Sequence, residues 1–265
     1  GSHYRKSYRR AKLKMFKVDL NCDLGEYRSV SEERKEIEVM PLISSTNIAC
    51  GLHAGDDRSI RKTMRRAFEF GVGIGSHPSF PDRDNFGRKA MVLPEVKLRD
   101  VVCRQITEFI NHASACGVAM THVKAHGALY NMAAVDLRLA TVICETIAGL
   151  DSDMLVFGLA NSRWVKAAEV TGLQIVEEVF SDRRYLSGSE LVPRVDQSAL
   201  ITDVSEAEQQ VLKMVHQNLV TSIDGVDHHL VPGTVCIHGD SPEAYHIAVK
   251  LRSSFERHGV KVMPP

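Results

Sequence analysis

Residues 16–26 read FKVDLNCDLGE, an apolar run that ends abruptly in polar side chains able to carry chemistry. Four further apolar runs end in the same way, at residues 51–56, 75–78, 124–127 and 238–240. An α/β barrel builds its active site in this manner, because the carboxyl ends of its parallel strands meet at one mouth. The pattern therefore predicts an enzyme whose reactive groups gather at one end of a barrel.

Helix-like and strand-like segments alternate along the chain. Apolar residues at helical spacing predict helices over residues 31–40, 56–70, 94–116, 136–150, 161–171, 205–218 and 240–258. Short apolar runs predict strands over residues 16–21, 45–49, 73–76, 121–123, 154–159, 174–180, 234–238 and 260–263. Since no linker interrupts the alternation, we expect one domain over residues 15–265 with seven or eight β/α units.

Local signals refine this outline. Residues 205–208 read SEAE, a capping box that predicts a helix start. Asp240 or Ser241 would cap the last helix, with Pro242 in its first turn. Residues 78–93 and 183–202 show no periodic pattern, and loops of that length in a compact domain are commonly lids or binding loops.

Composition excludes some classes of partner. The 265 residues include 33 basic and 33 acidic ones, so the net charge favours neither a nucleic acid nor a membrane surface as partner. No apolar run approaches the ~18 residues that a membrane helix needs. The six cysteines form no C-x-x-C pair, and we expect buried, reduced thiols in a cytoplasmic protein.

The first fourteen residues look foreign to the fold. Gly1-Ser2-His3 resembles a scar of tag cleavage, and residues 4–14 hold six Lys or Arg and no acid. We expect a tag or leader over residues 1–14, with Met15 as the natural start of the chain. A basic targeting arm is the competing interpretation.

Most polar clusters have both a functional and a purely structural interpretation. Asp23 and Glu26 could act as acid, base or cation ligand, or could belong to a turn. His53 lies between two glycines, where the backbone can approach a ligand, whereas Asp56 could simply cap a helix. Arg88 ends a proline-stiffened loop and is a candidate anion clamp, although internal ion pairs of a solvated loop would explain it equally well.

The strongest physical argument for a functional role concerns Lys124. In a strand, His122 and Lys124 point to the same side, toward or away from the barrel axis. A lysine inside a barrel is costly to bury unless it meets an anion, either a carboxylate or a substrate group. By contrast, residues 177–185 and 191–194 resemble a surface salt-bridge cluster, and Asp240 resembles a helix cap. A functional role is harder to dismiss for His238, which ends the last apolar strand.

Several common motifs are absent from the sequence. It contains no G-x-x-x-x-G-K-[ST] phosphate loop, no G-x-S-x-G and no H-E-x-x-H. We therefore expect chemistry that uses carboxylate, histidine and lysine side chains rather than a serine triad or a zincin helix.

Seven segments, taken in order, resemble the LamB/YcsF family. They are VDLNCDLGE (18–26), NIACGLHAGD (47–56), HPSFPDRDNFGR (77–88), HVKAHGALYN (122–131), EEVFSDRRY (177–185), LVPR (191–194) and CIHGD (236–240). The chain departs from the family pattern at Leu52, Ala125 and Ser181, where Phe, Pro and Ala are usual. The resemblance implies a seven-stranded, TIM-like (β/α) barrel related to the polysaccharide deacetylase and glycoside hydrolase group.

The resemblance also implies a function. Such a chain would be the A subunit of an ATP-dependent 5-oxoprolinase, which hydrolyses 5-oxo-L-proline (pyroglutamate) to L-glutamate while ATP is cleaved to ADP and phosphate. Separate B and C subunits would be its partners. Because the phosphate loop is absent, we expect ATP to bind mainly through those partners. Whether the chain binds a divalent cation and whether it forms a homo-oligomer are left open.

Roles follow for the candidate residues. Asp23 or His126 would be the general base, and Lys124 and Arg88 would bind a carboxylate or phosphate. His53 and His77 would orient water or substrate and complete the predicted catalytic set. The predicted substrate-binding residues are Asn21, Glu26, Asn47, Asp56, Arg88, Tyr130, Asn131, Asp182, Arg183, Arg194, His238 and Asp240.

Two alternatives remain at this point. A metal-dependent deacetylase or amidohydrolase would act on a carbohydrate or lactam, with Asp23, His53, His77 and His126 as a cation site. A subunit that only binds a lactam or sugar is the non-enzymatic possibility, and the many titratable groups at one mouth argue against it.

Overall fold

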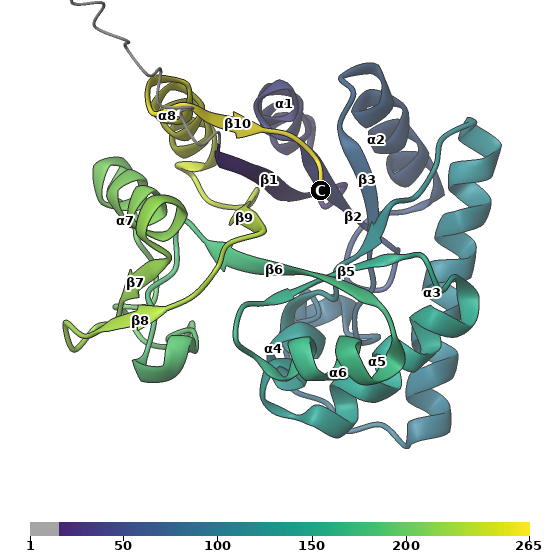
Figure 1. Cartoon of the computed structure of the whole chain (residues 1–265). Helices are drawn as coiled ribbons and strands as arrows, with labels where there is room; N and C mark the ends of the chain where they lie inside the picture. The colour runs from purple at the N-terminus through teal and green to yellow at the C-terminus, as the bar shows by residue number, and fades with distance from the viewer. Residues whose placement is uncertain (1–15) are drawn as a thin grey trace, which may run out of the picture.

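The computed structural model describes residues 16–265, so the predicted tag or leader over residues 1–14 lies outside the described residues. Seven parallel strands close into a barrel, because β9 pairs with both β6 and β1 (Figure 1). The barrel strands are β1 (Phe16–Leu24), β2 (Ser45–Ala49), β3 (Gly73–His77), β4 (His122–Val123), β5 (Leu155–Leu159), β6 (Gln174–Phe180) and β9 (Thr234–Ile237). The predicted seven-stranded (β/α) barrel is confirmed.

Helices surround the barrel on the outside (Figure 1). They are α1 (Val30–Val39), α2 (Asp57–Glu69), α3 (Glu95–Cys116), α4 (Gly127–Val135), α5 (Leu137–Leu150), α6 (Arg163–Thr171), α7 (Val204–Gln217) and α8 (Ala244–Arg257). Three short additions are the parallel strand β10 (Val260–Val262) on β1 and the antiparallel hairpin of β7 (Leu219–Thr221) and β8 (Asp227–His229). Within residues 16–265, none of the helices has the length and apolar character needed to cross a membrane.

Some predicted helix starts were wrong. The N-cap of α7 is Asp203, whose carboxylate accepts the backbone N–H of Glu206, so the capping box at residues 205–208 is not used. The last helix begins only at Ala244. Asp240 does not cap it, since that carboxylate pairs with Arg88 instead. These local signals were overridden because a neighbouring acid offered the α7 cap and a distant arginine competed for Asp240.

Helix α4 and the β7–β8 hairpin were not predicted. The sequence of α4, GALYNMAAV, is apolar almost all round, so it lacks the amphipathic stripe that reveals a surface helix. The helix is covered on several sides, and Ala128, Leu129 and Ala133 are all buried. It matters for the site because it begins directly after His126.

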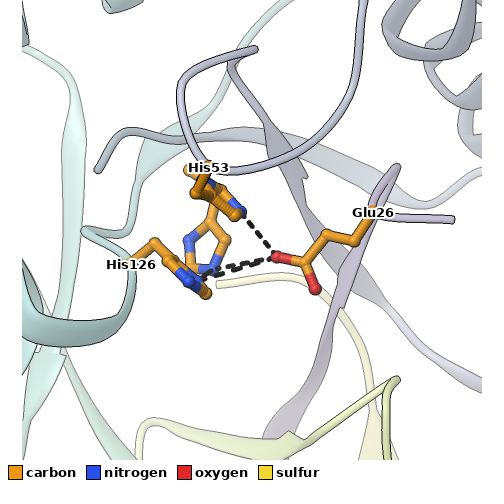
Figure 2. A group of neighbouring side chains, drawn as sticks. Glu26, His53 and His126 are labelled. Atoms are coloured by element: carbon orange, nitrogen blue, oxygen red, sulfur yellow. Dashed lines mark hydrogen bonds and ion pairs between the residues drawn. The ribbon is translucent and has the colours of Figure 1, made fainter. Parts of the chain in front are cut away.

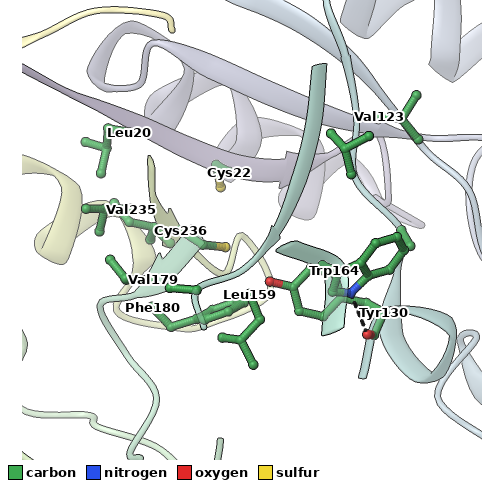
Figure 3. Packing of buried hydrophobic residues seen from close by; sticks show 14 of the residues in the cluster. Leu20, Cys22, Val123, Tyr130, Leu159, Trp164, Val179, Phe180, Val235 and Cys236 are labelled. Carbon is green, nitrogen blue, oxygen red and sulfur yellow. Dashed lines mark hydrogen bonds between the residues drawn. The ribbon is translucent and has the colours of Figure 1, made fainter. Parts of the chain in front are cut away.

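An apolar layer fills the space between strands and helices (Figure 3). Leu20, Val235 and Val179 are register partners on β1, β9 and β6, and all are buried on the outer side of the barrel wall. The indole of Trp164 in α6 packs over Gly158 and donates a hydrogen bond of 3.1 Å to the carbonyl of Tyr130. This packing attaches α4 and α6 to the sheet and so supports one side of the mouth.

The barrel interior, by contrast, also contains buried polar and charged side chains. Because side chains alternate along a strand, Asp19, Asn21 and Asp23 of β1 all point inward. Asp19 accepts hydrogen bonds from the hydroxyls of Ser44, Ser45 and Thr234, at 2.5–2.7 Å. The same alternation places Asp23 at the carboxyl end of the barrel, which is the mouth expected to bear the active site.

Gly75 makes room for a ring in this interior. A Cβ at this position would lie 2.1 Å from Nε2 of His122, which donates to the Asn47 side-chain oxygen at 2.8 Å. His122 also stacks on Phe157, with ring centroids 3.9 Å apart. A side chain at residue 75 would therefore displace a fully packed ring.

We expect Gly75→Ala to lower the free energy of unfolding by about 1–3 kcal/mol, the usual cost of overpacking a core. Gly149→Ala in α5 is the matched control, because nothing lies within 4 Å of its added Cβ and alanine favours the helix. Urea denaturation of both variants measures the difference. Equal stability of the two variants would contradict the packing assigned to His122.

Candidate active site

A pocket of about 980 Å³ opens at the carboxyl end of the barrel. It brings together residues that the sequence predicted: Asp23, Glu26, His77, Arg88, Lys124, His126, Tyr130, Asn131, Arg183, Arg194, His238 and Asp240. Part of its wall comes from the long loop over residues 183–202, as expected for a binding loop. The remaining predicted residues, Asn21, Asn47, His53, Asp56 and Asp182, do not line it.

Lys124 lies on the floor of this pocket and is 2% exposed. Its ammonium group contacts Oδ1 of Asp23 at 3.0 Å and Oε1 of Glu178 at 2.7 Å. Burial disfavours the charged lysine, but these carboxylates outweigh burial and hold the pKa of Lys124 well above its usual value. The anion that a buried lysine requires is therefore supplied by the protein itself.

Asp23 is held as a carboxylate. Burial alone would raise its pKa, but His77 and Lys124 together place that pKa well below its ordinary value. Oδ1 accepts from Lys124 and from the side-chain amide of Asn47, at 3.0 and 2.9 Å. Oδ2 has a looser partner, Nε2 of His77 at 3.4 Å. One carboxylate oxygen is thus less firmly engaged than the other at the edge of the pocket.

Asn21 and Asn47 support this pair from below. Both are fully buried, and Asn47 donates to the side-chain oxygen of Asn21 at 2.8 Å. Asn21 in turn donates to Glu178 at 3.0 Å and accepts from Lys124 at 3.3 Å. The structure therefore places the two amides in the barrel interior, beneath the pocket, rather than in contact with it.

Glu178 is the residue that sequence reasoning missed. It is fully buried and accepts from Lys124 at 2.7 Å and from the hydroxyl of Tyr130 at 2.7 Å. The sequence suggested a surface salt-bridge cluster around residue 178. The strand period could have found it, because Glu178 shares with Val176 and Phe180 the inward side of a strand that is apolar at those positions.

Four side chains form what we call the imidazole cluster: Glu26, His53, His77 and His126. Figure 2 shows Glu26 pointing toward His53 and His126. Oε1 of Glu26 lies 2.7 Å from Nε2 of His53, 3.7 Å from Nδ1 of His126 and 4.0 Å from Nε2 of His77. The rings of His53 and His126 stack, with centroids 3.7 Å apart. Three imidazoles and one carboxylate thus share a space beside Asp23.

Burial separates the charge states within this cluster. It lowers the pKa of His53 well below its usual value and that of His126 to about 3, with nearby imidazoles adding to the effect. Burial opposes a positive charge on His77 as well, but Asp23 outweighs it and the pKa of His77 is raised. Burial raises the pKa of Glu26. His53 and His126 are therefore neutral rings at neutral pH.

The wall of the pocket carries further charged pairs. Arg88 contacts Asp240 at 2.5 Å, and both side chains are about 40% exposed. His238 contacts Oδ1 of Asp182 through Nδ1 at 2.7 Å, and Asp182 is almost fully buried behind it. Arg183 is also buried and donates to the carbonyl of Val192 at 2.6 Å. Asp182 therefore orients His238 rather than facing the pocket.

Asp56 has the structural role that the sequence had offered as its alternative. Its carboxylate accepts the backbone N–H of Ser59 at 2.8 Å, and the Ser59 hydroxyl accepts the N–H of Asp56 in a capping box that begins α2. It does not line the pocket.

Comparison with known proteins agrees with this geometry. The family model described as LamB/YcsF family matches residues 18–265. The chain belongs to the LamB/YcsF family. It is 44% identical over 248 residues to the 5-oxoprolinase A subunit from Bacillus subtilis (strain 168), and the match covers 94% of this chain and 96% of that protein. It is 42% identical over 245 residues to the 5-oxoprolinase A subunit from Bordetella parapertussis, covering 92% and 97%.

Solved structures of a lactam utilization protein and of a more distant barrel are similar as well. The lactam utilization protein from Thermus thermophilus superimposes with a TM-score of 0.86 at 35% identity, covering 94% of this chain and 99% of that one. The Xyl-CE4 domain of a xylanase from a Trinervitermes trinervoides hindgut metagenome has a TM-score of 0.50 at 11% identity, covering 94% and 86%. The second likeness shows a shared fold alone.

We expect Lys124→Met to destabilise the chain by about 3–5 kcal/mol, because the change leaves the carboxylates of Asp23 and Glu178 buried without their cation. Lys166→Met is the matched control, since Lys166 forms an exposed pair with Glu169 on α6 and such pairs contribute about 0–1 kcal/mol. Denaturant unfolding of both variants at pH 7 is the measurement. A loss no larger than that of the control would disprove the assigned role.

Glu36 offers a test by pH. Its carboxylate accepts the backbone N–H groups of Gly25 and Glu26 at 2.9 and 3.0 Å, which holds the loop that carries Glu26. Burial raises the pKa of Glu36 from 4.5 to about 7. A raised pKa in the folded state contributes stability that is complete below pH 4.5 and is lost as the pH rises through about 7.

We therefore expect the stability advantage of the wild type over Glu36→Gln to shrink between pH 4.5 and pH 7.5. Glu38→Gln, an exposed change on the same helix, serves as the control. Thermal or urea unfolding across this pH range measures the trend. An advantage that grows with pH would contradict the assigned burial of Glu36.

Proposed function

We propose that this chain is the A subunit of an ATP-dependent 5-oxoprolinase, which opens 5-oxo-L-proline to L-glutamate together with B and C subunits. The observation that carries the proposal is the ionised Asp23, held by buried Lys124 on the floor of a pocket of about 980 Å³. The names of the relatives from Bacillus subtilis and Bordetella parapertussis support it.

The reaction explains why ATP is needed. A lactam amide is unreactive, and transfer of a phosphoryl group to its oxygen turns that oxygen into a good leaving group. Water then attacks the ring carbon, and cleavage of the ring C–N bond frees the amine and leaves γ-glutamyl phosphate. A second water attacks this acyl phosphate, phosphate leaves, and glutamate is formed. The site must take a proton from water, stabilise negative charge and return a proton to nitrogen. ATP would bind mainly through the partner subunits, since the chain has no phosphate loop.

Asp23 is the better of the two predicted bases. Its Oδ2 is the less firmly engaged oxygen, whereas both ring nitrogens of His126 already have partners, His77 at 3.0 Å and the carbonyl of Phe86 at 2.8 Å. Lys124 cannot easily bind the substrate as well, because its ammonium group already meets Asp23, Glu178 and Asn21. We therefore assign Lys124 to hold Asp23 in its ionised form.

His238 is suited to return the proton to nitrogen. Its Nδ1 is oriented by the buried carboxylate of Asp182, and the ring lines the pocket near Asp23. Arg88 and Arg194 on the wall would bind the substrate carboxylate. Arg88 has donors to spare beyond its pair with Asp240.

The decisive experiment combines the chain with its B and C subunits, ATP and 5-oxo-L-proline, and measures L-glutamate and ADP. We expect Asp23→Asn to lower kcat by about 10²–10⁴-fold, the usual contribution of a general base. Asp153→Asn, in an exposed turn, is the control and should keep full activity. Undiminished turnover by Asp23→Asn would overturn the role of Asp23, and absence of glutamate with every partner combination would overturn the function.

A second candidate, a metal-dependent deacetylase or amidohydrolase, is favoured by one observation, the imidazole cluster beside Asp23. It differs in needing neither ATP nor partners. Hydrolysis of N-acetylated sugars by the isolated chain in the presence of a divalent transition metal would support it. Tight binding of 5-oxo-L-proline without turnover in any mixture would instead indicate a protein that only binds the lactam.

A further inference from the structure

The imidazole cluster contains a contact that two neutral rings cannot make. Nδ1 of His77 lies 2.7 Å from the carbonyl oxygen of Lys124, and Nε2 of His126 lies 2.8 Å from that of Phe86. A carbonyl oxygen only accepts, so each of these nitrogens carries its ring's proton. When both rings are neutral, Nε2 of His77 and Nδ1 of His126 are therefore both lone pairs, and they face each other at 3.0 Å.

Two facing lone pairs repel, so something positive belongs between them. It is either a proton shared by the two rings or a metal ion that both nitrogens coordinate. Oε1 of Glu26 and Nε2 of His53 border the same space, and the four candidate ligand atoms lie within 4.8 Å of one another. Ligand atoms around a tetrahedral ion with bonds of about 2.0–2.1 Å lie roughly 3.3 Å apart, so small shifts suffice.

The surroundings of the rings match those of metal ligands. Metal-binding histidines usually donate their second ring N–H to a carbonyl or carboxylate, which fixes the tautomer and the ring orientation. His77 and His126 both do this through backbone carbonyls. His53 is fully buried, and its Nδ1 has no partner among the described residues. Its Nε2 lies 2.7 Å from Oε1 of Glu26, where a bound ion would replace the proton between the two atoms.

The loop over residues 86–88 holds the rings in place. Phe86 has a left-handed backbone, with φ 56°, and its ring packs edge-on against His53 and His126. A Cβ at Gly87 would lie 2.9 Å from Cδ2 of His126 and 3.0 Å from Cβ of His53. The chain therefore approaches both rings as closely as a glycine permits, which preorganises the cluster.

We propose that Glu26, His53, His77 and His126 bind one divalent transition-metal ion of the Zn²⁺ class, with three imidazole nitrogens and one carboxylate oxygen. Imidazole-rich sets of this kind suit Zn²⁺ and its first-row neighbours rather than Mg²⁺ or Ca²⁺. The ligand set differs from the sequence-based one in that Glu26 replaces Asp23, whose carboxylate is engaged by Lys124. The site does not depend on which reaction the chain catalyses.

A second cluster, Asp23, Cys236 and His238, is a weaker candidate for the ion. The thiol of Cys236 already lies 3.2 Å from the ammonium of Lys124, which would repel a cation. Cys236→Ser therefore separates the two locations without touching the imidazole cluster.

The test is metal binding by the whole chain, free of any assay of activity. Chelator-stripped wild type is titrated with ZnCl₂ by calorimetry, and metal content after dialysis is measured by elemental analysis. We expect one ion per chain, a higher melting temperature with Zn²⁺ and, after Co²⁺ loading, visible absorption of a nitrogen- and oxygen-ligated ion.

Variants locate the ion. Glu26→Gln and His126→Ala should each weaken Zn²⁺ binding at least tenfold, while the exposed controls Glu256→Gln and His246→Ala should bind as the wild type does. Far-UV circular dichroism shows whether each variant is folded. If a variant is unfolded, the Co²⁺ spectrum of the wild type remains the evidence for a nitrogen- and oxygen-ligated ion. Absence of stoichiometric metal in the wild type would mean a shared proton and overturn the proposal. Loss of binding in Cys236→Ser but not in Glu26→Gln would overturn it as well.

Discussion

The ammonium group of Lys124 inside the barrel is the interaction on which the rest of the structure depends. Its charge cannot be buried without compensation, so β1 and β6 each supply a carboxylate, Asp23 and Glu178. Those carboxylates then need donors of their own, which Asn47 provides to Asp23 and Tyr130 provides to Glu178. One buried charge thus organises a hydrogen-bonded network inside the barrel, and an apolar layer packs between the strands and the helices.

The same residue connects this network to the imidazole cluster. Its side chain holds Asp23 ionised, and its backbone carbonyl orients the ring of His77. Burial then acts in opposite directions on neighbouring groups, since it keeps His53 and His126 neutral while the charge of Asp23 favours the cationic form of His77. Groups whose pKa values are pushed apart in a shared space are typical of sites that move protons or bind cations.

Sequence reasoning predicted the architecture well because that architecture follows from local periodicity. The bounds of β2 and β6 were predicted correctly, and most helices differ by one or two residues at their ends. Periodicity failed at α4, which is apolar almost all round, and at the start of α8, where a partner 152 residues away, Arg88, pairs with Asp240. Such failures occur where a long-range contact competes with a local preference.

The sequence by itself determined that strands end in reactive side chains at one mouth, that the chain has the motifs of the LamB/YcsF family, and that Lys124 requires an anion. The first and third conclusions need only strand alternation and the cost of a buried charge, and the second needs only the ordered sequence motifs. Only the tertiary structure decided that Glu178 is a partner of Lys124, that Asn21 and Asn47 lie beneath the pocket, and that Glu26 joins three histidines. The physical reason is that barrel closure sets which side chains from distant segments meet, and no local pattern encodes those distances.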